Sequence, residues 1–174
     1  MLDVSDPGAF DAANAAGIIV LDRTGTEDPD IGLISSDPVT EAGDPSLSSQ
    51  IRRMNDGPWA LVIRNGANST SEQAVLLIQY LDGDRKLVKL RAGEASGNGL
   101  SAPRLVDLNR DRIPDVAYAG DLQGNLWKFD LSADDPGAWK VAFSGKSLHA
   151  TPRPPASDSR SPQPRSGRHT RRAA

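Results

Sequence analysis

The chain has 174 residues, enough for one domain of ordinary size, and its 20 basic and 23 acidic side chains give a formal net charge of −3. This balance argues against a general nucleic-acid-binding protein. The sequence contains no cysteine, which excludes a disulfide framework and a thiolate zinc site. With 16 glycines and 13 prolines the chain is interrupted often by turns, so long helices are not expected.

Short apolar or alternating segments bounded by Gly, Asp, Asn or Pro predict β-strands along most of the chain. These segments are residues 18–21, 59–63, 74–81, 86–90, 104–107, 116–119 and 126–131. Residues 82–84 and 123–125 supply Gly, Asp and Asn, which tolerate positive φ and favour hairpin turns. Residues 11–16 could form one helical turn. The predicted fold class is all-β.

An internal repeat indicates how the strands are grouped. The opening LDVSDPGAF, residues 2–10, reappears as FDLSADDPGAW at residues 129–139. Pro7 and Pro136 are 129 residues apart, which equals three units of 43, and propeller blades commonly have about 40–50 residues. We therefore expect a partial β-propeller of about three to four blades; the alternative is chance reuse of a common Asp-Pro-Gly turn. Three or four blades cannot close a ring, which suggests a piece of something larger.

Composition changes abruptly near residue 151. Residues 152–174 contain six arginines, five prolines and four serines, and no Val, Ile, Leu, Met or aromatic residue. We therefore divide the chain into a partial propeller, residues 1–150, and a disordered Arg/Pro/Ser-rich tail, residues 151–174. Three interpretations of the tail stay open: an arm that binds phosphates or an acidic surface, a solvated tail, or the product of a shifted reading frame.

The segment DLNRDRIPD, residues 107–115, has the spacing of a calcium-binding loop. The candidate ligands are the side chains of Asp107, Asn109, Asp111 and Asp115 and the carbonyl of Ile113. A hard dication needs six to eight oxygens, and a tightly coiled loop turns every second side chain inward. Arg112 replaces the usual glycine at position 6 and Tyr118 replaces the glutamate at position 12, so a helical calcium sensor is not expected. The alternative is an Asp/Asn-rich turn that binds no ion.

Other candidate sites are weaker. The two histidines, His149 and His169, offer no catalytic triad or His-rich metal site, and no general acid or base stands out, so we predict no catalytic residues and no enzyme. Residues 65–69, NGANS, are either a polar ligand-binding loop or a turn. The tryptophans Trp59, Trp127 and Trp139, with Phe129 and Tyr118, are either packing residues between blades or a sugar platform.

Residues 97–132, GNGLSAPRLVDLNRDRIPDVAYAGDLQGNLWKFDLS, resemble the C-terminal β-propeller of PilY-type proteins, which are type IV pilus biogenesis factors and pilus-tip adhesins. The likeness extends upstream through PWALVIRNGANS, to residues 28–32 and to the opening LDVSDPGAF, and it covers about residues 1–150. Arg64 and Ala67 stand where the family usually has glycine and an aromatic residue, and residues 40–49 look like a diverged loop.

This resemblance implies quinoprotein-like blades and a calcium ion bound by the loop at residues 107–115. It also implies a place at the cell surface, the outer membrane or the pilus tip, and a role in pilus extension and retraction, twitching motility and adhesion. The implied partners are pilins, minor pilins and host or surface ligands, with no nucleic acid. No apolar run approaches the length of a transmembrane helix, and the first ten residues do not read as an export leader.

Two other functions stay open. The stretch AGDLQGNLWKFDL, residues 119–131, is similar to the repeat of propellers that carry a quinone cofactor, so the chain could be the remnant of a quinoprotein dehydrogenase. An integrin-like calcium propeller used for recognition shares the loop pattern and differs mainly in its partner.

Overall fold

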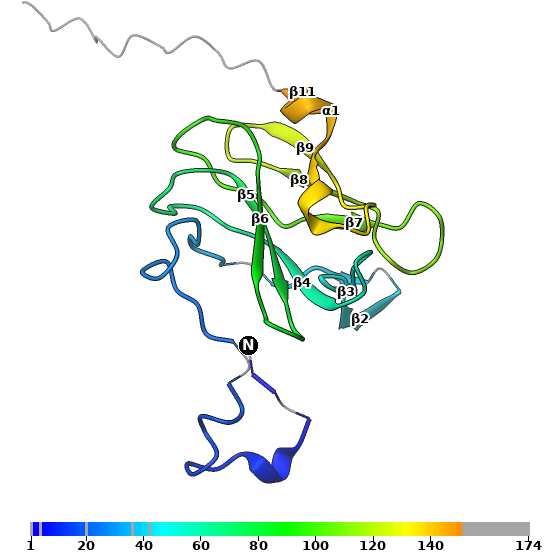
Figure 1. Cartoon of the computed structure of the whole chain (residues 1–174). Coiled ribbons are helices and arrows are strands. Elements are labelled where there is room, and N and C mark those ends of the chain that lie inside the picture. The colour runs from blue at the N-terminus through cyan, green and yellow to red at the C-terminus, as the bar shows by residue number, and fades with distance from the viewer. Residues whose placement is uncertain (1, 4, 20, 36, 42, 151–174) are drawn as a thin grey trace, which may run out of the picture.

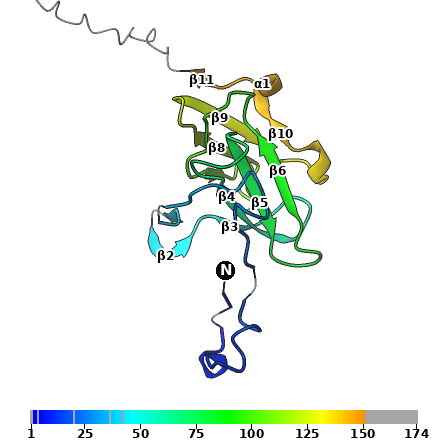
Figure 2. The same ribbon diagram turned by 90° about the vertical axis from the view of Figure 1, so that its left-hand side faces the viewer.

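A computed structural model describes residues 2–3, 5–19, 21–35, 37–41 and 43–150. The tail predicted at residues 151–174 therefore lies outside the described residues. The N-terminal part holds a 3₁₀ turn, η1 (Pro7–Ala9), and a two-stranded antiparallel sheet of β1 (Thr40–Glu41) and β2 (Asp44–Ser48). The dark-blue residues 5–19 lie away from the larger sheets in both views, whereas Gly32 and Leu33 hydrogen-bond to Asn65 and Ala67 just after β4 (Trp59–Arg64) of the first large sheet (Figure 1, Figure 2).

The first large sheet is a simple antiparallel meander in the order β3-β4-β5-β6. Its strands are β3 (Ile51–Arg53), β4 (Trp59–Arg64), β5 (Val75–Tyr80) and β6 (Leu87–Arg91). All six residues of β5 are buried, which fits its apolar run VLLI; the buried Gln79 side chain donates to the Tyr80, Arg85 and Lys86 carbonyls.

The second large sheet has the order β10-β9-β8-β7, with β11 paired to β9 beside this path. Its strands are β7 (Arg104–Val106), β8 (Val116–Gly120), β9 (Asn125–Asp130), β10 (Lys140–Val141) and β11 (His149–Ala150). A 3₁₀ turn, η2 (Pro136–Ala138), leads into β10, and the short segment α1 (Ala142–Gly145) follows it.

The two large sheets share one apolar core. Residues of one face of β4 and β5 meet residues of one face of β8 and β9, because side chains two apart on a strand point to the same side. The fully buried members include Val62, Leu76, Ile78, Ala117 and Phe129. This arrangement of stacked antiparallel sheets confirms the predicted all-β fold class.

Six of the predicted strand segments coincide with β4 to β9 to within one or two residues. The segment predicted at 18–21 is wrong as a strand. Ile19 makes a single antiparallel bridge to Leu2, and both side chains are about half exposed, so no neighbouring strand buries this segment within the described residues. The helical turn considered for residues 11–16 is a run of turns. The sequence patterns missed β1, β3, β10 and β11, which have two or three residues each, and β2, whose sequence DPSLS has a single large apolar residue.

The repeated Asp-Pro-Gly-Ala motif folds in the same way at both positions. Asp6 Oδ1 accepts a hydrogen bond from the Gly8 N–H at 2.9 Å, and Asp135 Oδ1 accepts one from the Gly137 N–H at 2.8 Å. In each case the Asp caps a 3₁₀ turn that starts with proline. Of the expected three to four blades, the described residues build two large sheets and one two-stranded sheet.

Candidate calcium loop

The predicted loop joins two antiparallel strands. Asp107 directly follows β7 and Asp115 directly precedes β8, and Val106 pairs with Val116 at the mouth of the loop. The sequence-based prediction that the loop connects two strands of one blade, and not two helices, is therefore confirmed.

Hydrogen bonds from its own backbone hold the loop in a coil. Asp107 accepts the Arg110 N–H through Oδ1 at 2.6 Å and the Arg112 N–H through Oδ2 at 2.7 Å. Asn109 Oδ1 accepts the Asp111 N–H at 2.9 Å, and Asp111 Oδ1 accepts the Ile113 N–H at 2.8 Å. The alternating Asp and Asn residues are therefore needed for the shape of the loop, because each one satisfies N–H groups that no strand would pair.

Asp115 closes the loop. Its Oδ2 accepts the Leu108 N–H at 2.7 Å, so the last candidate ligand lies next to the first turn. Its own backbone is fixed on both sides, since its N–H donates to the Val106 carbonyl and its carbonyl accepts the Leu131 N–H. Asp115 is only 7% exposed, whereas Asn109 and Asp111 are on the surface.

Two arginines adopt left-handed backbone conformations in the loop. Arg110 has φ of 68° and Arg112 has φ of 73°. Glycine is the residue that takes this conformation without a penalty, and other L-residues lose about 1–2 kcal/mol there. Arg112, which stands where a calcium loop usually has glycine, therefore keeps the backbone path of the loop but lowers its conformational stability.

The donor chemistry of the loop suits a hard cation. Among the described residues, no three His, Cys, Asp or Glu side chains are gathered as a ready metal cluster. Each of the four side chains at positions 107, 109, 111 and 115 nevertheless offers an oxygen atom of the kind that ligates a hard cation. A carboxylate oxygen has two lone pairs, so an oxygen that accepts one N–H can still ligate an ion. Asp107, Asn109, Asp111 and Asp115, with the Ile113 carbonyl, would hold the ion, which would supply charge neutralisation and rigidity.

An asparagine that the sequence analysis did not single out ties this loop to the first sheet. The Asn55 side-chain nitrogen donates to the Pro114 carbonyl at 3.0 Å and to the Leu131 carbonyl at 2.8 Å. Asn55 lies in the turn between β3 and β4, 59 residues from Pro114. No local pattern could have shown this contact, because it exists only when the two sheets are stacked.

A second carboxylate organises the turn between β8 and β9. Asp121 accepts the N–H groups of Gln123 and Asn125, and its other oxygen accepts the side chains of Asn98, Asn125 and Trp127 at 2.8–2.9 Å. Burial alone would raise the pKa of Asp121, but these hydrogen bonds favour the charged form and leave its pKa below the usual value. Asp121 thus has a structural role.

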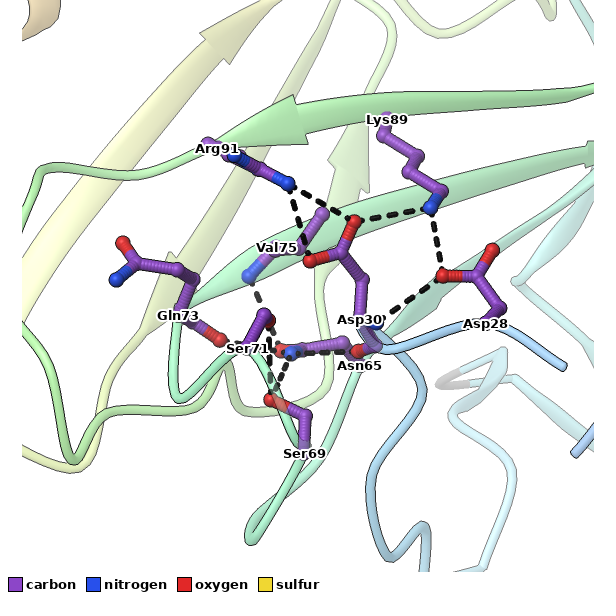
Figure 3. Close-up of polar contacts among 9 residues, drawn as sticks. All are labelled: Asp28, Asp30, Asn65, Ser69, Ser71, Gln73, Val75, Lys89 and Arg91. Carbon is purple, nitrogen blue, oxygen red and sulfur yellow. Dashed lines mark hydrogen bonds and ion pairs between the residues drawn. The ribbon is translucent and has the colours of Figure 1, made fainter. Parts of the chain in front are cut away.

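Figure 3 shows a polar network that fastens the N-terminal segment to the first sheet. Asn65 is fully buried; its side chain donates to the Asp30 and Gln73 carbonyls and accepts the N–H groups of Val75 and Leu100. At Gly66, where φ is 77°, a Cβ would overlap the Leu33 carbonyl. The NGANS segment is accordingly a packed turn whose first side chain has all its hydrogen bonds within the protein.

An ion-pair cluster completes that network. Lys89 Nζ lies 2.6 Å from Asp28 Oδ1 and 2.9 Å from Asp30 Oδ2, and Arg91 Nη2 lies 3.4 Å from Asp30. Burial raises the pKa of Asp30, but hydrogen bonds from Lys89 and Ser71 and the nearby cations outweigh this effect and lower it.

The tryptophans are divided between core and surface. Trp127 and Trp139 are 6% and 4% exposed and belong to the shared core, together with the fully buried Phe129. This confirms the packing interpretation for these three residues. Trp59 is 50% exposed at the start of β4.

Comparisons with known proteins agree with this architecture. The family model for the PilY1 beta-propeller domain matches residues 7–160, past the boundary predicted at residue 150. The type IV pilus biogenesis factor PilY1 of Pseudomonas aeruginosa is 37% identical over 161 residues, a match that covers 82% of this chain and 13% of that protein. A homolog of the same factor from Xylella fastidiosa is 31% identical over 153 residues, a match that covers 82% of this chain and 9% of that protein.

The solved structure of the P. aeruginosa PilY1 C-terminal domain superposes with a TM-score of 0.60 at 34% identity, over 72% of this chain and 27% of that chain. The chain thus spans a small part of the length of the curated relatives that it matches. No helix in the described part of the chain has the length and apolar character needed to span a bilayer. On the family match and these identities, the chain belongs to the PilY1 beta-propeller family.

Proposed function

We propose that this chain is a calcium-binding propeller segment of a type IV pilus biogenesis factor. The observation that carries the proposal is the closure of the loop at residues 107–115. Asp115 Oδ2 accepts the Leu108 N–H at 2.7 Å, which brings the two ends of the loop together. Calcium would neutralise three carboxylates held within nine residues, so that part of its binding energy would stabilise the local fold.

The pilus part of the proposal is supported by the relatives, which are named as type IV pilus biogenesis factors. We propose that the segment acts as a structural and adhesive module and not as an enzyme, in contact with pilins, minor pilins and surface ligands. Calcium occupancy would then adjust pilus extension and retraction, and with them twitching motility and adhesion. The implied location is the cell surface or pilus tip.

Calorimetric titration of the full chain with calcium tests the site directly. We expect saturable heat for the unchanged protein and its loss in Asp111→Ala and in Asp115→Ala. Asp134→Ala is the matched control, because Asp134 is an exposed acid in a turn outside the loop. Equal heats in all four proteins would contradict the calcium site.

The pilus role can be tested in a chimera. Residues 7–150 of this chain would replace the matching segment of the P. aeruginosa relative, and the width of the twitching zone would be measured. We expect the chimera to retain twitching and the same chimera with Asp111→Ala to change it, with Asp134→Ala again as the control. Twitching that is the same with and without Asp111 would contradict a regulatory role for the loop.

A further inference from the structure

A cavity of about 210 Å³ lies between the first large sheet and the segment of residues 21–34, which we call the strap. The sheet lines it with Leu61 and Ile63 of β4, Leu77 and Gln79 of β5, and Leu87 of β6. These residues alternate along their strands with members of the shared core such as Val62 and Ile78. The cavity therefore lies on the face of the first sheet that points away from the shared core.

The strap is fastened to the sheet at several points. Leu33 and Ala67 exchange two backbone hydrogen bonds, and Lys89 binds Asp28 and Asp30 of the strap, as Figure 3 shows for the ion pairs. Both walls of the cavity are thus held by the protein itself, as in ligand sites that are formed before the ligand arrives.

Gln79 is the polar side chain that the sheet contributes to this wall, and it is only 2% exposed. Its Nε2 donates to the carbonyls of Tyr80 at 2.9 Å and Arg85 at 2.6 Å, so the amide nitrogen is used by the end of β5 and the turn that follows. Its Oε1 accepts no hydrogen bond from any described residue. A buried acceptor without a donor is uncommon in folded proteins and costs stability, so a donor supplied by a ligand would be favourable here.

The other lining residues define the chemistry of that ligand. Besides its apolar side chains, the strap contributes Asp22 and Arg23, whose opposite charges leave the lining without net charge. A neutral ligand with an apolar body is therefore favoured, and the Arg23 guanidinium favours an aromatic ring over an aliphatic chain. The volume lies below the usual range of about 300–1,000 Å³ for drug-sized ligands, so a ligand of one or two rings is expected.

We propose that this cavity binds a small neutral aromatic molecule with one N–H or O–H donor, of the indole or phenol type. Gln79 Oε1 accepts the hydrogen bond of the donor, and the leucines of the sheet remove the ring from water. The proposal is independent of calcium, because no residue of the loop at 107–115 lines the cavity.

The test follows the methyl resonances of the full chain by NMR during titration with indole, and separately with 1-methylindole, which has the same ring system without the donor. We expect the methyl groups of Leu61, Ile63 and Leu77 to shift and to saturate at a common midpoint. Val62 and Ile78, on the opposite face of the same strands, should hardly move. The midpoint for indole should be about 5-fold lower than for 1-methylindole, the usual effect of one neutral hydrogen bond.

Variants in the strap separate the cavity from general attraction to the protein surface. Ile34→Trp places a large side chain in the cavity wall and should abolish the saturable shifts. Ile34 is 44% exposed, so a larger side chain there need not disturb the core. Leu33→Trp is the matched control, because Leu33 is exposed and adjacent but does not line the cavity, and it should bind indole as the unchanged protein does.

Gln79→Met tests the acceptor. This variant should bind indole and 1-methylindole with equal midpoints, while unchanged Val62 and Ile78 resonances would show that the fold is kept. If Gln79→Met does not fold, the comparison of the two compounds in the unchanged protein and the pair of strap variants still decide the proposal.

Three results would overturn the proposal. Shifts that never saturate, or that saturate equally in Ile34→Trp, would exclude the cavity as the binding site. Equal midpoints for indole and 1-methylindole in the unchanged protein would refute the preference for a donor. A preference for indole that persists in Gln79→Met would refute the role of Gln79 as the acceptor.

Discussion

Lys89 places its ammonium nitrogen 2.9 Å from Oδ2 of Asp30, a carboxylate whose side chain is 1% exposed. Removal of this cation in Lys89→Met would leave a buried negative charge with Arg91, at 3.4 Å and largely exposed, and the Ser71 hydroxyl as its remaining side-chain partners among the described residues. We expect unfolding in urea to show a loss of about 1–3 kcal/mol, below the roughly 3–5 kcal/mol found for fully buried pairs.

Two variants check the cause of that loss. Lys146→Met removes an exposed lysine and should have almost no effect on unfolding. The double variant Lys89→Met with Asp30→Asn should recover part of the stability, since the buried group would no longer be charged. A double variant as unstable as Lys89→Met alone would show that packing of the lysine stem, and not its charge, is responsible.

Stability should fall in acid because the pKa values of Asp30 and Asp121 are lowered in the folded protein. Near and below the ordinary value of 3.8 the unfolded chain binds more protons than the folded one, so the free energy of unfolding rises with pH in that range. We expect a flat profile above about pH 5 and a progressive loss below about pH 4.

Asp121→Asn should make that loss shallower and should lower stability at neutral pH by about 1–3 kcal/mol, because hydrogen bonds to a charged acceptor are weakened. Thermal unfolding between pH 2.5 and 7 measures both effects. Asp134→Asn, in an exposed turn, is the control and should reproduce the unchanged profile. An identical acid limb in the two variants would rule out Asp121 as a contributor.

The left-handed backbone of Arg112 predicts an unusual benefit from glycine. Arg112→Gly should be more stable than Arg112→Ala by about 1 kcal/mol, since only the alanine has a Cβ that opposes φ of 73°. Calcium affinity, measured by calorimetry, should also be higher in Arg112→Gly than in Arg112→Ala. Because both variants lose the guanidinium, their difference isolates the backbone, and a more stable Ala variant would contradict this account.

Asn55→Ala should weaken the link between the two sheets. The change leaves the Pro114 and Leu131 carbonyls without their donor, at a cost of about 1–3 kcal/mol if water does not replace it. Chemical denaturation measures the loss. Asn14→Ala, in the exposed turns near the N-terminus, is the comparison and should be close to neutral.

Local patterns predicted strands that contain an apolar run, such as β5. In a chain with many turns, a short apolar run favours a buried strand. They also predicted the loop between β7 and β8, because the Asp and Asn residues that define it are regularly spaced within nine consecutive residues. They failed at 18–21, where the described residues make a single bridge, between Ile19 and Leu2, and form no strand. An apolar segment becomes a strand only when another strand supplies its hydrogen bonds.

The rest of the site depends on contacts that are distant in sequence. Asn55 reaches Pro114 and Leu131 only because the two sheets stack. The resemblance to PilY-type proteins indicated the fold and family correctly, and calcium binding stays a prediction. The two interpretations of the NGANS segment could be distinguished only with coordinates, because the Asn65 side chain hydrogen-bonds to carbonyl and N–H groups from three other segments of the chain.

The double hydrogen bond from Asn55 limits how this loop can change in length. Pro114 and Asp115 are held at one end by Asn55 and by strand pairing, while residues 108–112 are exposed to solvent. An insertion after Pro114 would strain the contact between the two stacked sheets, whereas an insertion next to Arg110 would disturb the hydrogen bonds and ligand spacing of the outer coil but leave both sheets in place. Loop grafts and labels should therefore be placed at the tip, where the chain can grow outward without moving either sheet.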